Sequence, residues 1–354
     1  MKSPANRPCP DCTEQAGVDR RTFLQGATTL AAVAATSTLP GFTTARALGG
    51  PQSVRTPETA VKALYDTLTD AQKKEVCFDW NHQDARGLLR THVSNNWQIT
   101  KPTIDSEFFK PEQRELALEI FKGIFNPDWH ARLFKQLKDD TEGKPWGASQ
   151  SFAIFGQPGT NQFEYVMTGR HMTIRADGNS EAHVALGGPI FHGHAASGFN
   201  EKVHHPDNVF WHQAVQANHI YEMLSGKQQQ QALVAHRPAE AAVAFRGPTG
   251  KFPGIPVSEL TRDQRDNMQK VLMTLIEPYR KADQDEVLAC LMRQGGLERC
   301  SLAFYREGDI GDDGEWDNWR LEGPSFVWYF RGQPHVHIWV NVADDPGVQL
   351  NAKG

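Results

Sequence analysis

The sequence predicts an α+β protein built from two similar halves. In each half, segments with apolar residues at helical spacing come first, and segments that alternate with the period of a strand follow. Short motifs also recur in the same order, about 150 residues apart. We expect halves at about 58–199 and 212–345. A pseudo-twofold axis should relate them, with their sheets either joined or packed face to face.

The repeated motifs support this division because several weak similarities keep one order and nearly one spacing. Gly169 matches Gly323, and His183-Val184 matches His335-Val336. The longer matched segments are Leu64–Gln72 with Ile220–Gln228, Phe109–Arg114 with Leu260–Arg265, and Ser151–Phe155 with Ser301–Tyr305. A duplicated unit is the simplest explanation of such a series.

The helices are predicted from their start signals and their apolar spacing. A Thr, Ser or Pro followed three residues later by Gln is typical of a helix N-terminus. Amphipathic stretches follow two of these signals: Leu116, Ile120, Phe121 and Ile124 in the first half, and Met268, Val271, Leu272, Leu275 and Ile276 in the second.

The strands are predicted from runs rich in β-branched and aromatic residues, bounded by Gly, Pro and Asp. The expected strands are Ser151–Phe155, Phe163–Ile174, Ala182–Leu186, Ser301–Tyr305, Trp319–Leu321, Phe326–Phe330 and His335–Val342. After Gly187-Gly188-Pro189 we expect a glycine-rich loop that holds His192 and His194. Helices and strands are segregated in each half, which favours the α+β class.

The N-terminus carries the features of a twin-arginine export signal. Arg20-Arg21 precedes a short apolar stretch, Gly26 to Leu39, and the cleavage pattern Ala45-Arg46-Ala47. We therefore expect a signal peptide at 1–47, a single domain at 48–354 and a periplasmic or secreted location. The twin-arginine export machinery would be a partner, and no stable membrane span would remain after cleavage. An uncleaved anchor is the alternative.

Charge and cysteine content narrow the classes of partner. The full chain has a net charge of −5, and loss of residues 1–47 removes five positive and three negative side chains, which leaves −7. No basic cluster remains, so we do not expect nucleic acid to be a partner. In an oxidising compartment Cys290 and Cys300 could pair, or they could stay buried free thiols.

The strongest functional signal is a pair of histidines near the C-terminus. The run Gln333–Val340 places His335 and His337 in alternation within an apolar strand, so both imidazoles project from one face. Two neutral imidazoles side by side are suited to bind a metal ion.

A metal site needs three or four converging ligands. We expect His171, and with it His194, to complete the shell around one transition-metal ion: zinc, copper or iron. If so, the ring nitrogens of His171, His335 and His337 should lie within about 3–4 Å of one another.

The sequence leaves the activity open between a metal-dependent hydrolase and an oxidoreductase acting on an unidentified small molecule. Glu322 is the candidate proton carrier and Arg170 the candidate anchor for an anionic substrate, although an internal ion pair is the ordinary reading of such residues. The alternative function is a non-catalytic exported binding protein. In that case some of the nine tryptophans would line a pocket for a carbohydrate-like ligand.

Several motifs resemble one known family. Gly169-Arg170-His171-Met172-Thr173-Ile174, Gly188-Pro189-Ile190-Phe191 and Trp319–Phe326 followed by His-x-His resemble the motifs of the family catalogued as domain of unknown function 3500. The resemblance extends over about residues 60–342. It implies a shared fold and a shared histidine site, without a reaction.

The chain also departs from the pattern of that family. Arg170 replaces the first histidine of a pair, Glu322 replaces a glutamine, and Pro334 replaces an asparagine. The positions that the resemblance carries over are therefore His171, His335 and His337.

Overall fold

A computed structural model describes residues 55–178, 180–195, 208–311 and 313–348. These residues belong to one compact unit, Ser53–Gly354. The predicted export signal at 1–47 lies outside the described residues. Within the described part of the chain, no helix is long and apolar enough to cross a membrane.

One large mixed sheet runs through the fold, with the strand order β1-β4-β5-β6-β7-β13-β12-β11-β10-β8 and β9 paired to β10. The first-half strands are β1 Cys77–Phe78, β4 Ser151–Gly156, β5 Phe163–Gly169, β6 Met172–Ala176 and β7 Ile190–His194. The second-half strands are β8 Leu233–Val234, β9 Ile255–Pro256, β10 Ser301–Tyr305, β11 Asn318–Gly323, β12 Phe326–Arg331 and β13 Val336–Val342. A short separate hairpin joins β2 (Gln83–Asp84) to β3 (Gly87–Leu88).

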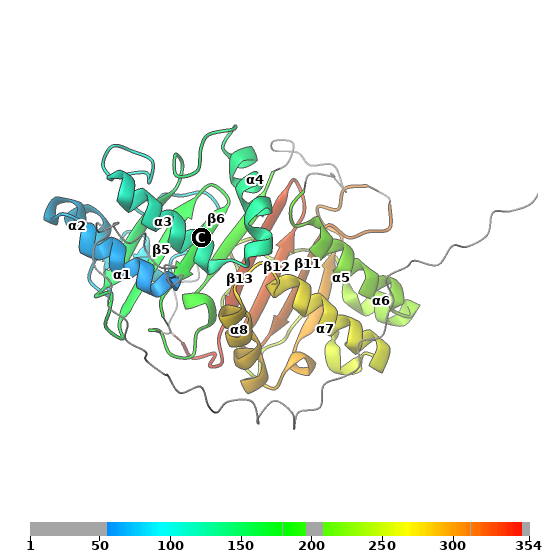
Figure 1. Cartoon of the computed structure of the whole chain (residues 1–354). Helices are drawn as coiled ribbons and strands as arrows, with labels where there is room; N and C mark the ends of the chain where they lie inside the picture. The colour runs from blue at the N-terminus through cyan, green and yellow to red at the C-terminus, as the bar shows by residue number, and fades with distance from the viewer. Residues whose placement is uncertain (1–54, 179, 196–207, 312, 349–354) are drawn as a thin grey trace, which may run out of the picture. The chain divides into compact units, whose positions relative to one another are not determined.

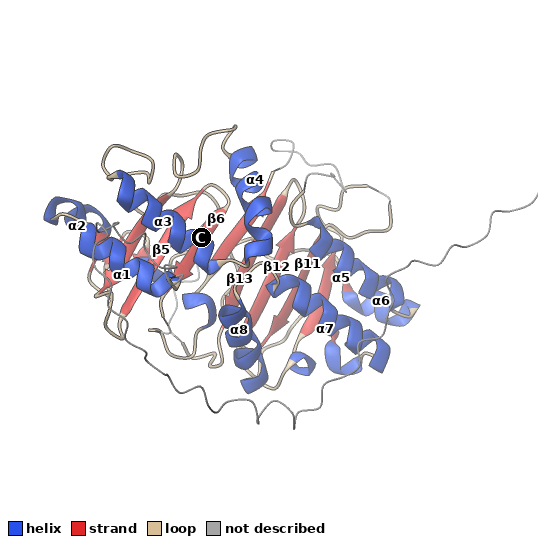
Figure 2. Ribbon diagram, in the orientation of Figure 1, coloured by secondary structure: helices blue, strands red, loops and turns tan. Residues whose placement is uncertain are grey.

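The labelled helices lie against one face of this sheet (Figures 1 and 2). Those of the first half are α1 Pro57–Thr67, α2 Asp70–Val76, α3 Pro111–Ile124 and α4 His130–Asp140. Those of the second half are α5 Trp211–Met223, α6 Gly226–Ala232, α7 Arg262–Ile276 and α8 Lys281–Arg293. The α+β class predicted from the sequence is confirmed.

The two halves meet along β7 and β13, which pair antiparallel from Val336–His194 to Val340–Ile190. The expected halves therefore join edge to edge in one sheet. On both sides of this seam the strands follow in the same chain order, with a parallel two-residue strand at each end. On the helix side, Phe125 and Tyr279 form a β-bridge across the halves, and their rings stack at 5.9 Å.

Paired glutamines connect the helix starts in each half, and all of them are buried except the half-buried Gln228. The Gln72 and Gln113 side chains exchange hydrogen bonds of 2.9 and 3.0 Å, and each also donates to a backbone carbonyl. Gln228 and Gln264 do the same in the second half, with two bonds of 3.2 Å. Thr69, Ser225 and Thr261 thus cap their helices as expected, whereas α3 has Lys110 as its N-cap and Pro111 as its first residue. The glutamine three residues after each cap also joins the helices.

The core fills both faces of the sheet. On the helix face, Val336, Ile338 and Val340 of β13 pack in the main apolar cluster. The opposite face carries a smaller cluster, which includes Trp339 and the loop residue Val243. Alternation along β13 therefore sends His335 and His337 to the face opposite the helices.

Two sequence predictions are corrected around residues 182–194. The expected strand Ala182–Leu186 is a single β-bridge at Val184 followed by a 3-10 turn, Ala185–Gly187. Leu186 there has φ 60°, which a strand cannot accommodate. The expected loop around Gly193 is instead β7, because β6 and β13 supply partners on both of its edges.

The three described cysteines, Cys77, Cys290 and Cys300, are free thiols, and the last two are buried. The structure therefore agrees with buried free thiols rather than with a Cys290–Cys300 disulfide.

Candidate metal centre

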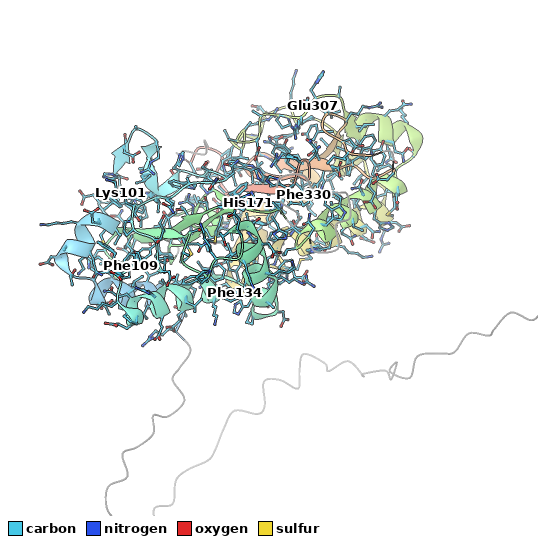
Figure 3. All side chains as sticks on the ribbon, turned by 90° about the horizontal axis from the view of Figure 1, so that it is seen from above. Lys101, Phe109, Phe134, His171, Glu307 and Phe330 are labelled. Atoms are coloured by element: carbon cyan, nitrogen blue, oxygen red, sulfur yellow. The ribbon has the colours of Figure 1, made fainter. Side chains whose placement is uncertain are left out.

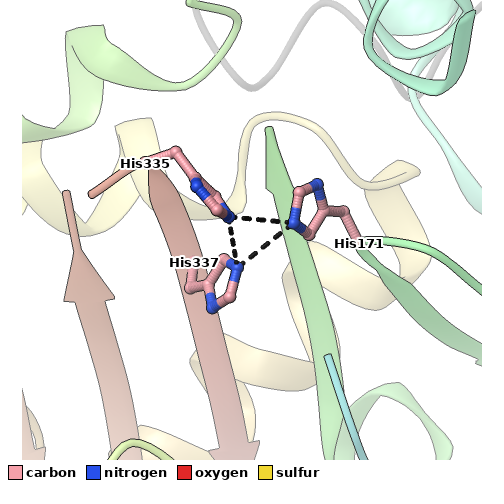
Figure 4. Close-up of side chains that lie close together, drawn as sticks. All are labelled: His171, His335 and His337. Atoms are coloured by element: carbon pink, nitrogen blue, oxygen red, sulfur yellow. Dashed lines mark hydrogen bonds between the residues drawn. The ribbon is translucent and has the colours of Figure 1, made fainter. Parts of the chain in front are cut away.

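Three imidazoles converge at the seam between the halves. His337 lies in β13, His335 directly precedes that strand, and His171 lies in the tight turn between β5 and β6. Their Nε2 atoms are 3.1 Å (His171–His335), 2.9 Å (His335–His337) and 3.2 Å (His337–His171) apart. Figure 4 draws the three rings with dashed lines between these atoms. The distance predicted from the sequence is met.

The position of His171 depends on long-range contacts. In the view of Figure 3 it lies between Phe109 of the first half and Glu307 of the second. Its φ is 57°, a left-handed conformation that residues other than glycine seldom adopt. Its N–H donates to the Asn95 carbonyl at 2.9 Å, and its carbonyl accepts from the N–H of Gly193 at 3.2 Å and from Nε2 of Gln136 at 3.3 Å. Three separate segments therefore hold this backbone in place.

A carboxylate stands behind two of the three rings. Oδ1 of Asp140 lies 3.0 Å from Nδ1 of His171, and Oε1 of Glu240 contacts Nδ1 of His337. Ionised carboxylates only accept hydrogen bonds, so each of these Nδ1 atoms carries the proton and each Nε2 presents a lone pair. The carboxylates thereby select the tautomer in which both rings can bind a metal.

The pKa values of His337, Glu240 and Asp140 keep the imidazole neutral and the carboxylates ionised at neutral pH. Burial lowers the pKa of His337 to about 3, against the opposing effect of Glu240. Burial, the largest single effect, acts to raise the pKa of Glu240, but the hydrogen bonds to His337 and Trp339 and the charges of His337 and Arg331 together outweigh it, and the pKa falls to about 2. For Asp140 too, burial acts upward, yet the neighbouring rings of His171 and His194 hold its pKa well below the usual range. Neutral imidazole beside ionised carboxylate is the form that binds metals.

The spacing of the nitrogens fits an ion. Nitrogens bound at about 2.0–2.1 Å, with bond angles between octahedral and tetrahedral values, lie about 2.9–3.4 Å apart. The three observed distances of 2.9, 3.1 and 3.2 Å fall in this range. Lone pairs that face one another repel unless a cation lies between them. Over the described ranges, no other group of His, Cys, Asp and Glu converges in this way.

His194 does not converge with these three side chains. It ends β7 and is fully buried, with Nδ1 3.7 Å from Oδ2 of Asp140 and Nε2 3.7 Å from Oδ2 of Asp139. It therefore contacts the carboxylate that supports His171. Its place in the ligand shell, expected from the sequence, is not seen in the group that could hold the ion.

Glu322 lies two strands away from the histidines. It accepts hydrogen bonds from Nε of Arg246 at 2.8 Å and from Nη2 of Arg320 at 2.9 Å. In the ladder, Glu322 of β11 pairs with Val327 of β12, and Val327 pairs with Asn341 of β13. Asn341 lies four residues beyond His337 along that strand. That offset amounts to about 14 Å along the strand. Glu322 therefore forms an internal ion pair with Arg246 and Arg320, which was the alternative interpretation of its sequence position.

Arg170 stands next to His171 and bridges to Asn96. It lines a cavity of about 360 Å³ together with Trp97, Lys144 and Asp140. Asp140 is therefore shared between this cavity and the ring of His171.

The tryptophans are mostly core residues. Five of the nine are buried: Trp129, Trp211, Trp319, Trp328 and Trp339. Trp80 lines one cavity and Trp97 another, so these two do not form a common platform.

Sequence reasoning missed Asp140 and Glu240. Asp140 ends α4, and Glu240 lies in an Ala-rich loop, with no motif around either. They lie 31 and 97 residues from the histidines that they support, so only tertiary structure brings them together.

Comparison with known proteins identifies the family. The sequence profile of the family described as a protein of unknown function (DUF3500) matches residues 51–343. The chain therefore belongs to this family, as its motifs suggested. No curated protein and no solved structure matches the chain.

Proposed function

We propose that the protein is an exported metal-dependent enzyme in which His171, His335 and His337 hold one transition-metal ion. The observation that carries this proposal is the convergence of three Nε2 atoms within 2.9–3.2 Å. Two of these rings are backed by carboxylates that fix the metal-binding tautomer.

The donor set indicates what the ion could do. Three neutral ligands leave the charge of a divalent ion uncompensated, and they leave coordination positions for water, dioxygen or a substrate oxygen. Zinc would favour hydrolytic chemistry, and iron or copper oxidative chemistry. Asp140 and Glu240 keep the rings oriented and increase their basicity.

Metal analysis tests the proposal directly. Protein purified without an affinity tag should contain about one equivalent of zinc, iron or copper, and His335→Ala and His337→Ala should each lose most of it. His219→Ala is the matched control, because His219 is exposed on α5 and remote in sequence from the ligands. Wild-type protein that stays metal-free after incubation with each ion would refute the metal centre.

We also propose that the halves descend from one duplicated unit and that the metal centre arose where they diverged. The common strand order and the paired glutamines support this. In the common strand order β6 corresponds to β12, and His171 and Ser325 each directly precede their strand. Ser325 donates to the Ala343 carbonyl at 2.8 Å, so the counterpart of His171 serves another contact.

Export rests on the N-terminal sequence alone. Replacement of Arg20-Arg21 by Lys-Lys should retain an uncleaved precursor in the cytoplasm, detected by cell fractionation and mass. Secretion of the double variant at the wild-type level would contradict the twin-arginine route.

A further inference from the structure

Arg331 is a buried cation beside the metal centre. It is the last residue of β12 and the ladder partner of His337, so the two side chains leave the same face of the sheet. Directly opposite residues in such a ladder have Cβ atoms about 4.5–5.5 Å apart. Only 7% of Arg331 is exposed.

The guanidinium of Arg331 is poorly satisfied. Neither Nε nor Nη2 has a hydrogen-bond partner among the described residues. The nearest carboxylate oxygen, Oε2 of Glu240, is 3.6 Å from Nε, beyond hydrogen-bond distance. Oε1 of the same carboxylate is already engaged by His337 and by Nε1 of Trp339.

Other buried arginines of the sheet are satisfied differently. Arg175 and Arg320 each donate to a carboxylate, at 2.8 Å to Glu164 and 2.9 Å to Glu322. Both also donate to backbone carbonyls. A buried arginine normally has such partners, because unpaired donors and charges are costly to bury. Among the buried arginines of the described strands, Arg331 therefore differs in lacking a hydrogen bond to a carboxylate.

A second cation increases the local positive charge. Arg237 donates to the carbonyl of Gln333, two residues beyond Arg331, and its charge lowers the pKa of Arg331, an effect secondary to burial. Glu240 thus contacts Arg331 and His337, while Glu307 accepts the backbone N–H of Arg237 at 3.2 Å. Among the described residues, neither guanidinium group has a carboxylate oxygen within hydrogen-bond distance.

We propose that Arg331, assisted by Arg237, binds the anionic group of the substrate, and that this substrate is a small organic acid. The planar fork of an arginine binds a carboxylate through two parallel hydrogen bonds. Since Arg331 neighbours His337 across the ladder, a carboxylate held there stands beside the metal centre. The role of the bound anion as part of a substrate rests on the proposed function. Binding of the anion by Arg331 can be tested without metal.

The test compares acetate with its neutral isostere acetamide in the full chain, with metal and after chelation. Binding is followed by the shift in thermal midpoint, with phosphate as a separate arm. Wild-type protein should bind acetate at least about tenfold more tightly than acetamide, and Arg331→Gln should lose that preference. Arg331→Lys should lose part of it, because an ammonium cannot form the bidentate pair.

Arg262→Gln is the charge-matched control, since Arg262 is exposed on α7. Acetate affinity unchanged in Arg331→Gln, or equal affinity for acetate and acetamide in wild-type protein, would overturn the inference. Tighter binding of phosphate than of acetate would show that the site prefers an inorganic anion, and it would overturn the assignment of an organic acid. If Arg331→Gln fails to fold, Arg331→Lys and Arg237→Gln decide by the same criterion. Absence of metal in wild-type protein refutes the proposed function alone.

Discussion

Oδ1 of Asp140 lies 3.0 Å from Nδ1 of His171, so the last residue of α4 orients a ring that belongs to the β5–β6 turn. The same oxygen accepts the N–H of Ala195, just beyond β7. A helix end, a turn and the seam strand are thereby tied together behind the metal centre.

Replacement of Asp140 by Asn should weaken metal binding by about 10- to 100-fold while the fold persists. The amide keeps the shape of the side chain but supplies only one oxygen and no charge to orient His171. Competitive titration against a chromophoric chelator measures the affinity. Asp139→Asn is the control, since Asp139 neighbours Asp140 yet pairs with Lys135 at 2.5 Å. Equal losses in both variants would argue against a specific role for Asp140.

Removal of the metal should destabilise the wild-type protein. An ion that binds only the folded chain adds about 2.7 kcal/mol when its free concentration is 100 times Kd. Urea denaturation with and without chelator should show this difference, and His337→Ala should not respond to chelator. A chelator effect of the same size in His337→Ala would place the ion elsewhere.

Gly193→Ala should disrupt the seam. A Cβ at Gly193 would lie 2.4 Å from the Val336 carbonyl oxygen and 3.3 Å from the ring of His337. We expect a loss of about 1–3 kcal/mol in the free energy of unfolding, together with weaker metal binding. Gly226→Ala, at the start of α6 with no atom within 4 Å of the added carbon, should be neutral or stabilising.

Gln113→Ala and Gln264→Ala should destabilise the protein by similar amounts, about 1–3 kcal/mol each, if the halves are equivalent. Each change removes the partner of three partly buried polar groups: the paired glutamine, a helix-start N–H and a backbone carbonyl. Chemical denaturation measures the cost. Glu112→Ala, next to Gln113 and exposed, serves as the control. A large cost in only one half would contradict the equivalence.

Glu286 should make stability depend on pH. Burial, chiefly, raises its pKa to about 7 from an ordinary 4.5, and the nearby carboxylates of Asp177 and Asp283 add to this. A carboxyl with a raised pKa in the folded state stabilises the fold below pH 4.5, and this contribution is lost as the pH rises through 7.

Glu286→Gln should therefore match wild-type protein near pH 5 and exceed its stability by about 1–2 kcal/mol at pH 8, after allowance for partial exposure. Denaturation in chelator at both pH values keeps the metal state constant. Asp285→Asn is the control, because Asp285 is exposed and pairs with Lys281. A variant less stable than wild type at pH 8 would show that the ionised form is favoured.

Local sequence patterns determined much of this protein. Period-2 alternation predicted β13 and the shared face of His335 and His337, and the x-x-Gln signals marked helix starts that the structure confirms. The repeated motifs predicted helices and strands in both parts of the chain, and both parts contribute helices and strands to the α+β fold. These features depend on residues close in the chain, where steric and capping preferences act.

Tertiary structure alone decided the remainder. Residues 190–194 follow Gly187-Gly188 and contain Gly193, and they form a strand because β6 and β13 supply partners on both edges. Asp140, Glu240 and Arg331 joined the histidines through contacts between segments far apart in sequence. Such contacts form only when burial of the apolar faces brings the segments together. The hydrogen bonds and charges involved follow no periodic sequence pattern, so the sequence does not predict them.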